Sequence, residues 1–313
     1  MTWSDYDPLA AAWAWLRSLA GLLTEPGSPF WWPTIVVAAL AFPGIGLVTR
    51  ASLRKMRRTA MPLPGRSFLR QSLQDAVCFT VNSALPFLLA PLFFLLSAAG
   101  ASVATALLTP ILGVPQGGAW FDHPLAMAAA ALIPFAAADL SLYGTHRLFH
   151  RVPLLWRAHR LHHEPAMLTP LTAFRFWPQE QIVHIGCASF MNGVGLGIVG
   201  AVLDARVEPL TLLGANAFTV VWNLAFSHLR HSHLALRFPR WLSHLLVSPH
   251  MHQAHHSVAA EHHDRNYATV FALWDWMFGT LYLPKDRERF RFGVERAEPV
   301  TAGRIGGDPR PAR

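Results

Sequence analysis

Charge is scarce in this sequence of 313 residues, since Asp, Glu, Lys and Arg together make up 14%, against roughly 25% in soluble globular domains. Apolar residues make up 52%. This balance argues against an ordinary soluble enzyme and favours a chain that lies largely in a membrane. The net charge is +8, but the cations do not form a basic pattern with interleaved aromatic residues, so we expect no nucleic-acid partner.

Cysteine is scarce as well. Cys78 and Cys187 each lie inside an apolar run without a second cysteine nearby, which argues against a disulfide framework and against a thiolate zinc site. A basic segment is absent from the N-terminus, where Asp5 and Asp7 stand instead. We therefore expect no secretory signal peptide.

Long apolar runs are abundant. A membrane-crossing helix needs about 20 residues, so residues 101–114 are too short and are expected to be re-entrant or interfacial. Residues 8–24 contain Arg17 and are expected to form an interfacial helix. The runs expected to cross the membrane are about 31–49, 76–99, 124–145, 182–203 and 209–227.

The expected fold is therefore an all-α integral membrane bundle of about four to five spans, with a cytoplasmic helical cap. We expect an N-terminal interfacial segment (1–30), a membrane-embedded domain (31–285) and a charged tail (286–313) that is disordered toward its end.

Basic residues in the loops predict the orientation. Residues 50–70 hold seven Lys and Arg and no acid, whereas residues 100–123 hold no Lys or Arg. By the positive-inside rule, the first of these loops is cytoplasmic and the second is not. Counting onward, residues 146–181 and those after about 228 are also cytoplasmic. These two regions hold fifteen of the seventeen histidines.

The histidines form four groups, three of which have helical spacing. Residues three or four apart share a face of a helix, so two or three imidazoles of one group can converge on one ion. Neutral imidazole is a ligand for iron, zinc and copper. The groups are His146 and His150; His159, His162 and His163; His228, His231 and His233; and His252, His255 and His256.

The number of these histidines predicts two metal ions, because catalytic sites commonly use three protein ligands per ion. The sequence holds no HExxH, no facing ExxH pairs and no CxxCH, which argues against zincin, ferritin-like and covalent haem sites. An all-histidine dinuclear centre beside an apolar bundle remains. Oxidising an unactivated C–H bond requires a redox metal with O2. His123, His184 and His244 are expected not to be ligands; His233, His250, His262 and His263 stay open.

From Asp139 to Glu180 and from Asn223 to Tyr282, the sequence resembles the fatty acid hydroxylase/sterol desaturase superfamily of membrane di-iron oxygenases. The segment DLSLYGTHRLFHRVPLLWRAHRLHHEP is similar to the family pattern D-x-x-x-Y-x-x-HR-x-x-H-x-x-P-x-LW-x-x-H-x-x-HH. The segment SPHMHQAHHS is similar to TPxxHRxHHS, and WDWMFGT to WDxLFGT. The sequence departs from the family at Trp177, Gln253 and Ala268, where the pattern has His, Arg and Gly.

The resemblance implies O2-dependent chemistry by two iron ions on a membrane lipid, such as a fatty acyl chain or a sterol, with zinc able to replace iron on purification. Because no fused haem or flavin domain is visible, we expect a separate electron-donor protein, cytochrome b5-like, a ferredoxin or a reductase. Hydroxylation, desaturation and ether cleavage stay open. His231 fits the third box best and His228 is a second candidate. The other implied ligands are His146, His150, His159, His162, His163, His252, His255 and His256.

Carboxylates and amides near the boxes could accept the second N–H of metal-binding histidines. The candidates are Asp139, Glu180, Asp264 and Asn266, although Arg175 and Glu180 are expected chiefly as an ion pair. The alternative function is a histidine-rich metal-ion transporter. It is disfavoured because a transporter places ionisable groups near the bilayer midplane, and the expected spans hold none at their centres.

Overall fold

The computed structural model describes residues 65–113, 123–204, 211–212, 215–222, 228–232, 235–285 and 288–294. The expected N-terminal segment (1–30), the first expected span (31–49) and the tail after residue 294 lie outside these ranges. Apart from one two-residue strand pair, the regular structure of the described residues is helical. This agrees with the all-α expectation.

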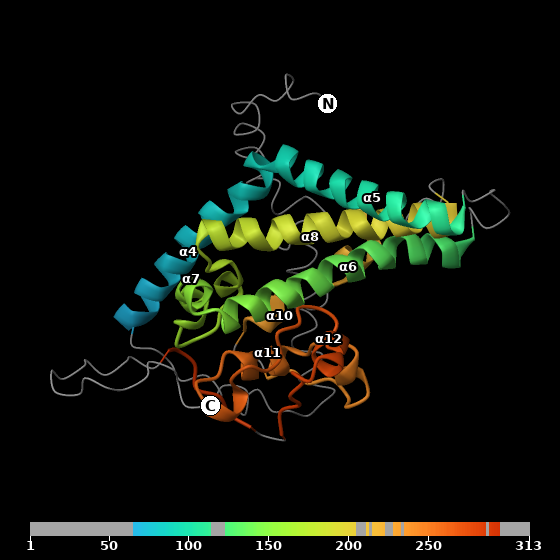
Figure 1. Cartoon of the computed structure of the whole chain (residues 1–313). Coiled ribbons are helices and arrows are strands. Elements are labelled where there is room, and N and C mark those ends of the chain that lie inside the picture. The colour runs from blue at the N-terminus through green and yellow to red at the C-terminus, as the bar shows by residue number, and fades with distance from the viewer. Residues whose placement is uncertain are drawn as a thin grey trace, which may run out of the picture.

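Three long helices form the apolar part of the molecule: α5 (Ala90–Leu112), α6 (Pro124–Arg151) and α8 (Pro178–Val199). Each is long and apolar enough to cross a membrane. In Figure 1 they lie side by side, with α8 between α5 and α6. The described residues thus hold three candidate spans, and α8 is the central one.

Glycines of α8 allow both neighbours to approach closely. A Cβ atom at Gly193 would lie 1.8 Å from the carbonyl oxygen of Ser97 in α5, and one at Gly195 would lie 2.4 Å from the Cα atom of Pro134 in α6. Neither position has room for a side chain. Small residues at such contacts let membrane helices pack backbone against backbone.

Two expectations for residues 76–114 are wrong. The run 76–99 is divided between α4 (Gly65–Leu88) and α5, and residues 101–112 continue α5 rather than forming a short re-entrant segment. The chain breaks at Leu89 because Pro91 follows, and proline favours the first turn of a new helix.

The fifth expected span, 209–227, is not a continuous helix where the structure describes it. Strand β1 (Thr211–Leu212) pairs antiparallel with β2 (Ala215–Asn216), and the short helix α9 (Ala217–Trp222) follows. The range contains Gly214 and Asn216, which are poor helix formers. A π-helical turn, η3 (Gly200–Asp204), ends α8 before it.

Short helices gather beside the C-terminal half of α6 (Figure 1). The residues of this region include most of the histidines. They pack on the C-terminal half of α6 through a core that includes Tyr143, Met251 and Tyr267. These elements are α7 (Pro153–His163), η2 (Pro170–Phe174), α10 (His228–Arg230), η5 (Leu242–His244), α11 (Pro249–His255), η6 (Ala260–His262) and α12 (Leu273–Met277).

Polar side chains of α4 fix the segment after α7. Asn82 donates to the carbonyl oxygens of Phe174 and Phe176, and buried Asp75 pairs with Arg175 at 2.8 Å. The expected ion pair between Arg175 and Glu180 is therefore wrong, because Asp75, about a hundred residues earlier, takes the guanidinium. Buried ion pairs of this kind need further hydrogen bonds to offset desolvation, and Thr172 supplies one to Asp75.

Candidate metal centre

The junction of α6 and α7 brings the first two histidine groups together. Val152 is extended (φ −95°, ψ 117°), as residues before proline usually are, and Pro153 begins α7. The chain turns there, so the ring of His159 lies 4.9 Å from that of His146 and 4.7 Å from that of His150, centroid to centroid.

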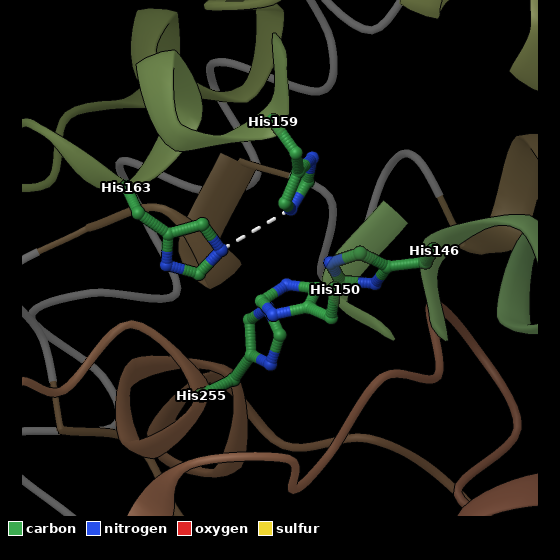
Figure 2. Close-up of side chains that lie close together, drawn as sticks. All are labelled: His146, His150, His159, His163 and His255. Atoms are coloured by element: carbon green, nitrogen blue, oxygen red, sulfur yellow. Dashed lines mark hydrogen bonds between the residues drawn. The ribbon is translucent and has the colours of Figure 1, made fainter. Parts of the chain in front are cut away.

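Five histidines from three helices form what we call the five-histidine cluster. Figure 2 shows their rings turned toward a common space, with α6 and α7 on one side and α11 on the other. One nitrogen of each lies within 4.8 Å of those of the others. The members are His146, His150, His159, His163 and His255.

Four further histidines form the adjacent four-histidine cluster: His162, His231, His252 and His256. All four are buried. The Nε2 atoms follow one another at 3.2, 2.9 and 3.2 Å, from His162 to His231 to His252 to His256. The rings of His163 and His256 stack with centroids 4.4 Å apart, so the two clusters are in direct contact.

Each HxxHH group divides between the clusters. On α7, the i,i+4 pair His159 and His163 belongs to the five-histidine cluster, whereas His162 belongs to the other. The last group does the reverse, since His252 and His256 lie in the four-histidine cluster and His255 in the five-histidine cluster. We expected the three imidazoles of a group to be able to share one ion; instead, each group joins two sites.

Hydrogen bonds to the outer nitrogens orient three rings of the five-histidine cluster. The Nδ1 atom of His159 lies 2.5 Å from Glu180 Oε1, that of His146 lies 2.7 Å from the carbonyl oxygen of Tyr267, and that of His255 lies 2.8 Å from the carbonyl oxygen of Arg265. An oxygen acceptor at Nδ1 fixes the proton there and leaves Nε2 with a free lone pair.

The inner nitrogens fit a metal. The Nε2 atoms of His146, His150 and His255 are buried without a hydrogen-bond partner. Two nitrogens bonded to one ion at ~2.1 Å lie roughly 3.0–3.4 Å apart at right-angle or tetrahedral geometry, and the Nε2 contacts are 2.9–3.2 Å. Lone pairs that converge so closely repel one another unless a proton or a metal ion lies between them, and a metal ion can satisfy several of them at once. The residues present therefore suit two imidazole-ligated ions.

Burial also favours the form of histidine that binds metal. It lowers the pKa values of the cluster histidines outside the spans well below 6.5. Neighbouring histidines lower these pKa values further, except at His231, where Arg230 does so. For His159 the pKa is lowered by burial, which Glu180 opposes. These imidazoles are neutral at pH 7, as metal ligation requires.

Of the four proposed outer partners, only Glu180 contacts a cluster histidine through its side chain. Asp264 accepts from the hydroxyl of Tyr267 and lies 3.5 Å from Arg151, half exposed. Asn266 donates to the carbonyl oxygens of Met251 and Tyr282, with a φ of 55°. Asn266 thus holds backbone rather than an imidazole.

Asp139 anchors the cap to α6. Its carboxylate accepts from the backbone N–H groups of Val270 and Phe271 and from the indole of Trp274, at 2.9–3.0 Å. Asp139 lies buried within α6, so this candidate span does contain an ionisable group. Its oxygens are occupied by three donors, which makes it a structural anchor and gives no support to the transporter alternative.

Several contacts were missed by sequence reasoning. His184 lies 3.5 Å from Glu180 and 2.8 Å from the hydroxyl of Thr145, so it braces the carboxylate; its i,i+4 spacing from Glu180 was the available signal. Phe176 stacks on His162 at 4.4 Å. Gln253, which departs from the family pattern, donates to the carbonyl oxygen of Ser232, beside His231.

The remaining histidines lie apart from the two clusters or cannot be placed. The side chain of His228 and all of His233 lie outside the described residues. His123 caps α6 and His244 bonds to the carbonyl oxygen of Arg240. His262 pairs with Glu288 at 3.0 Å, so part of the expected tail packs on the cap.

Comparison with known proteins agrees with the histidine pattern. A model of the fatty acid hydroxylase family matches residues 131–280, which include nine cluster histidines. An ornithine lipid hydroxylase of Rhizobium tropici is 28% identical over 162 residues, 50% of this chain and 43% of the relative. An alkylglycerol monooxygenase of Danio rerio is 26% identical over 155 residues, 50% and 31% of the two chains.

A third relative, a methylsterol monooxygenase of Aspergillus fumigatus, is 29% identical over 181 residues, 55% of this chain and 53% of the relative. The chain therefore spans 31–53% of the lengths of these three proteins. No solved structure matches the chain. The family match and the relatives support one assignment of the chain, to the fatty acid hydroxylase/sterol desaturase superfamily.

Proposed function

We propose that this protein is an O2-dependent di-iron oxidoreductase that hydroxylates a C–H bond of a membrane lipid. The observation that carries the proposal is the pair of adjacent all-histidine clusters, with five and four members. Two ions can be held side by side there, at the end of three apolar helices. Iron would supply the activation of O2, which no side chain can perform.

The chain's own residues would bind the ions, orient the ligands and exclude water. Glu180 and the carbonyl oxygens of Tyr267 and Arg265 hold the imidazoles of the five-histidine cluster so that Nε2 faces inward. Tyr267 is fully buried, and its ring packs on His150 at 5.1 Å. A cluster enclosed in this way would limit the access of water to the site where O2 is activated, and so favour reaction with the lipid.

The relatives bear names of different lipids: an ornithine lipid, an alkylglycerol and a methylsterol. What those names share is oxygen insertion into a lipid, and this shared reaction is the one we propose. Exposed apolar side chains on the long helices, such as Phe94, Leu107 and Leu125, suit contact with hydrocarbon. We further propose that the histidine clusters face the cytoplasm and receive electrons from a separate donor protein.

Metal content and oxygen transfer test this function together. Protein purified anaerobically from iron-replete cells should contain about two iron ions per chain. His255→Ala and His231→Ala, one from each cluster, should lower the metal content, whereas His244→Ala should not. Cells grown under 18O2 should carry label in a membrane lipid that is absent when His255→Ala replaces the wild type. One metal or none per chain would refute the dinuclear site, and unchanged lipid labelling would refute the reaction.

A further inference from the structure

A polar pocket of about 420 Å³ lies between α4 and the C-terminal end of α7. This size is within the range of small-ligand sites. Three arginines line it, Arg70, Arg160 and Arg175, with Glu164 as the acid among the lining residues. Ser67 and Gln74 add neutral polar groups. The pocket is therefore cationic and rich in hydrogen-bond donors.

The arginines of the pocket differ in how many hydrogen-bond partners they have within the protein. Arg175 is committed to the fold, since it donates to Asp75, to Gln74 and to the carbonyl oxygen of Leu161. The Nε atom of Arg160, by contrast, is buried and has no hydrogen-bond partner in the described part of the protein. Arg160 also lines the pocket, so an anion bound there would give its guanidinium a counter-charge.

The two faces of α7 give the pocket its position. Arg160 and Glu164 are four residues apart and share one face, which lines the pocket. His159 and His163 share the adjacent face, which enters the five-histidine cluster. One helix therefore separates the pocket from the candidate metal centre.

We propose that this pocket binds a phosphate group. A phosphate offers several oxygens to donors that converge from different sides, and arginine is the side chain best suited to it. Arg160 and Arg70 supply the charge, while Ser67 and the amide of Gln74 supply further donors. The group can belong to a phospholipid headgroup or to a small soluble phosphate.

A phospholipid is the source that fits the molecule's surroundings, because the pocket lies at the end of apolar helices where headgroups of a bilayer are found. Held there, the headgroup would place its lipid beside the helix that carries three cluster histidines. That the bound lipid is also the substrate of the enzyme rests on the proposed function. That the pocket binds a phosphate group does not.

Binding by purified full-length protein in a non-ionic detergent tests the proposal. The probes are phosphatidylglycerol, neutral diacylglycerol with the same chains, and glycerol 3-phosphate, each titrated and measured by native mass spectrometry. The variants are Arg160→Gln, Arg70→Gln and Ser67→Glu, which places a carboxylate at the pocket's exposed wall. Arg157→Gln, on the same helix but outside the pocket lining, is the matched control. Metal content reports whether each variant is folded.

We expect phosphatidylglycerol to bind about tenfold more weakly to Arg160→Gln, about threefold more weakly to exposed Arg70→Gln, and more weakly to Ser67→Glu. Arg157→Gln should bind as the wild type does. Binding of glycerol 3-phosphate as tight as that of phosphatidylglycerol would identify a soluble phosphate as the ligand, and much weaker binding would identify the lipid. Equal binding of diacylglycerol, or equal losses in Arg157→Gln, would overturn the proposal. Because turnover is not measured, failure here leaves the oxygenase reaction untouched.

Discussion

Glu180 is the side chain whose replacement tests most directly how the five-histidine cluster is held. Its carboxylate lies 2.5 Å from His159 Nδ1, and both side chains are at most 1% exposed. Hydrogen bonds to a charged group contribute about 1.5–3 kcal/mol, which corresponds to roughly 10–100-fold in metal affinity, the range typical of such outer partners. Glu180→Gln keeps an oxygen acceptor but loses the charge, so we expect the lower end of this range. Glu180→Ala leaves the N–H of His159 unsatisfied, and we expect the upper end.

The assay is a competition between metal-free protein and a chromophoric chelator for Co2+ at pH 7.5, with the variants compared side by side. Glu288→Gln is the matched control, because Glu288 also pairs with a histidine, His262, but outside both clusters. It should leave the affinity unchanged. If Glu180→Ala binds Co2+ as tightly as the wild type does, the carboxylate does not support the site and the reasoning is refuted.

Three further predictions concern the fold and its pH dependence. Asp139→Ala leaves three N–H donors of the cap without an acceptor and should lower the free energy of unfolding by about 2–4 kcal/mol; an unchanged melting temperature would contradict this role. Gly193→Ala should destabilise the α5–α8 contact, whereas Gly144→Ala, where a Cβ meets open space, should not, as comparison of their melting temperatures would reveal. Metal-free protein should lose stability as the pH falls below 6.5, because the unfolded chain then binds protons that the buried imidazoles resist; a melting temperature equal at pH 5 and pH 8 would contradict it. The imidazoles concerned are His162, His163, His231, His252, His255 and His256.

The membership of the clusters could be predicted from the sequence to the extent that it depends on helical spacing. Spacing of four residues places His159 and His163 on one face whatever the rest of the chain does. The division of each group between two clusters could not be predicted in this way. It depends on how α11 packs against α7, which is a contact between segments about ninety residues apart.

Partners of the buried carboxylates were the least predictable part. Asp139 precedes His146 by two helical turns, so we expected both side chains to face the same side of the helix. Its carboxylate oxygens instead accept from the backbone of a segment 131 residues later. Arg175 is near Glu180 in sequence but pairs with Asp75. Desolvation makes each buried charge require a partner, and tertiary packing decides which partner is near. Sequence spacing alone contains no such information.

The apolar runs predicted helices more reliably than their ends. Hydropathy indicated the ends of α6 and α8 to within six residues. It treated residues 76–99 as one segment because Pro86 and Pro91 lie inside an apolar run. Likewise, the run 209–227 is apolar enough to cross a membrane, although its described part begins with a strand pair. Composition records how apolar a segment is and not whether its backbone stays helical.

The glycines of α8 have a consequence for how a lipid could reach the metal centre. Where Gly193 and Gly195 meet α5 and α6, backbone lies against backbone and even a methyl group has no room. An acyl chain, several ångströms wide, cannot pass between these helices at that level. At this level neither the α5–α8 contact nor the α6–α8 contact admits hydrocarbon. A lipid that reaches the histidines from the bilayer must therefore take another route.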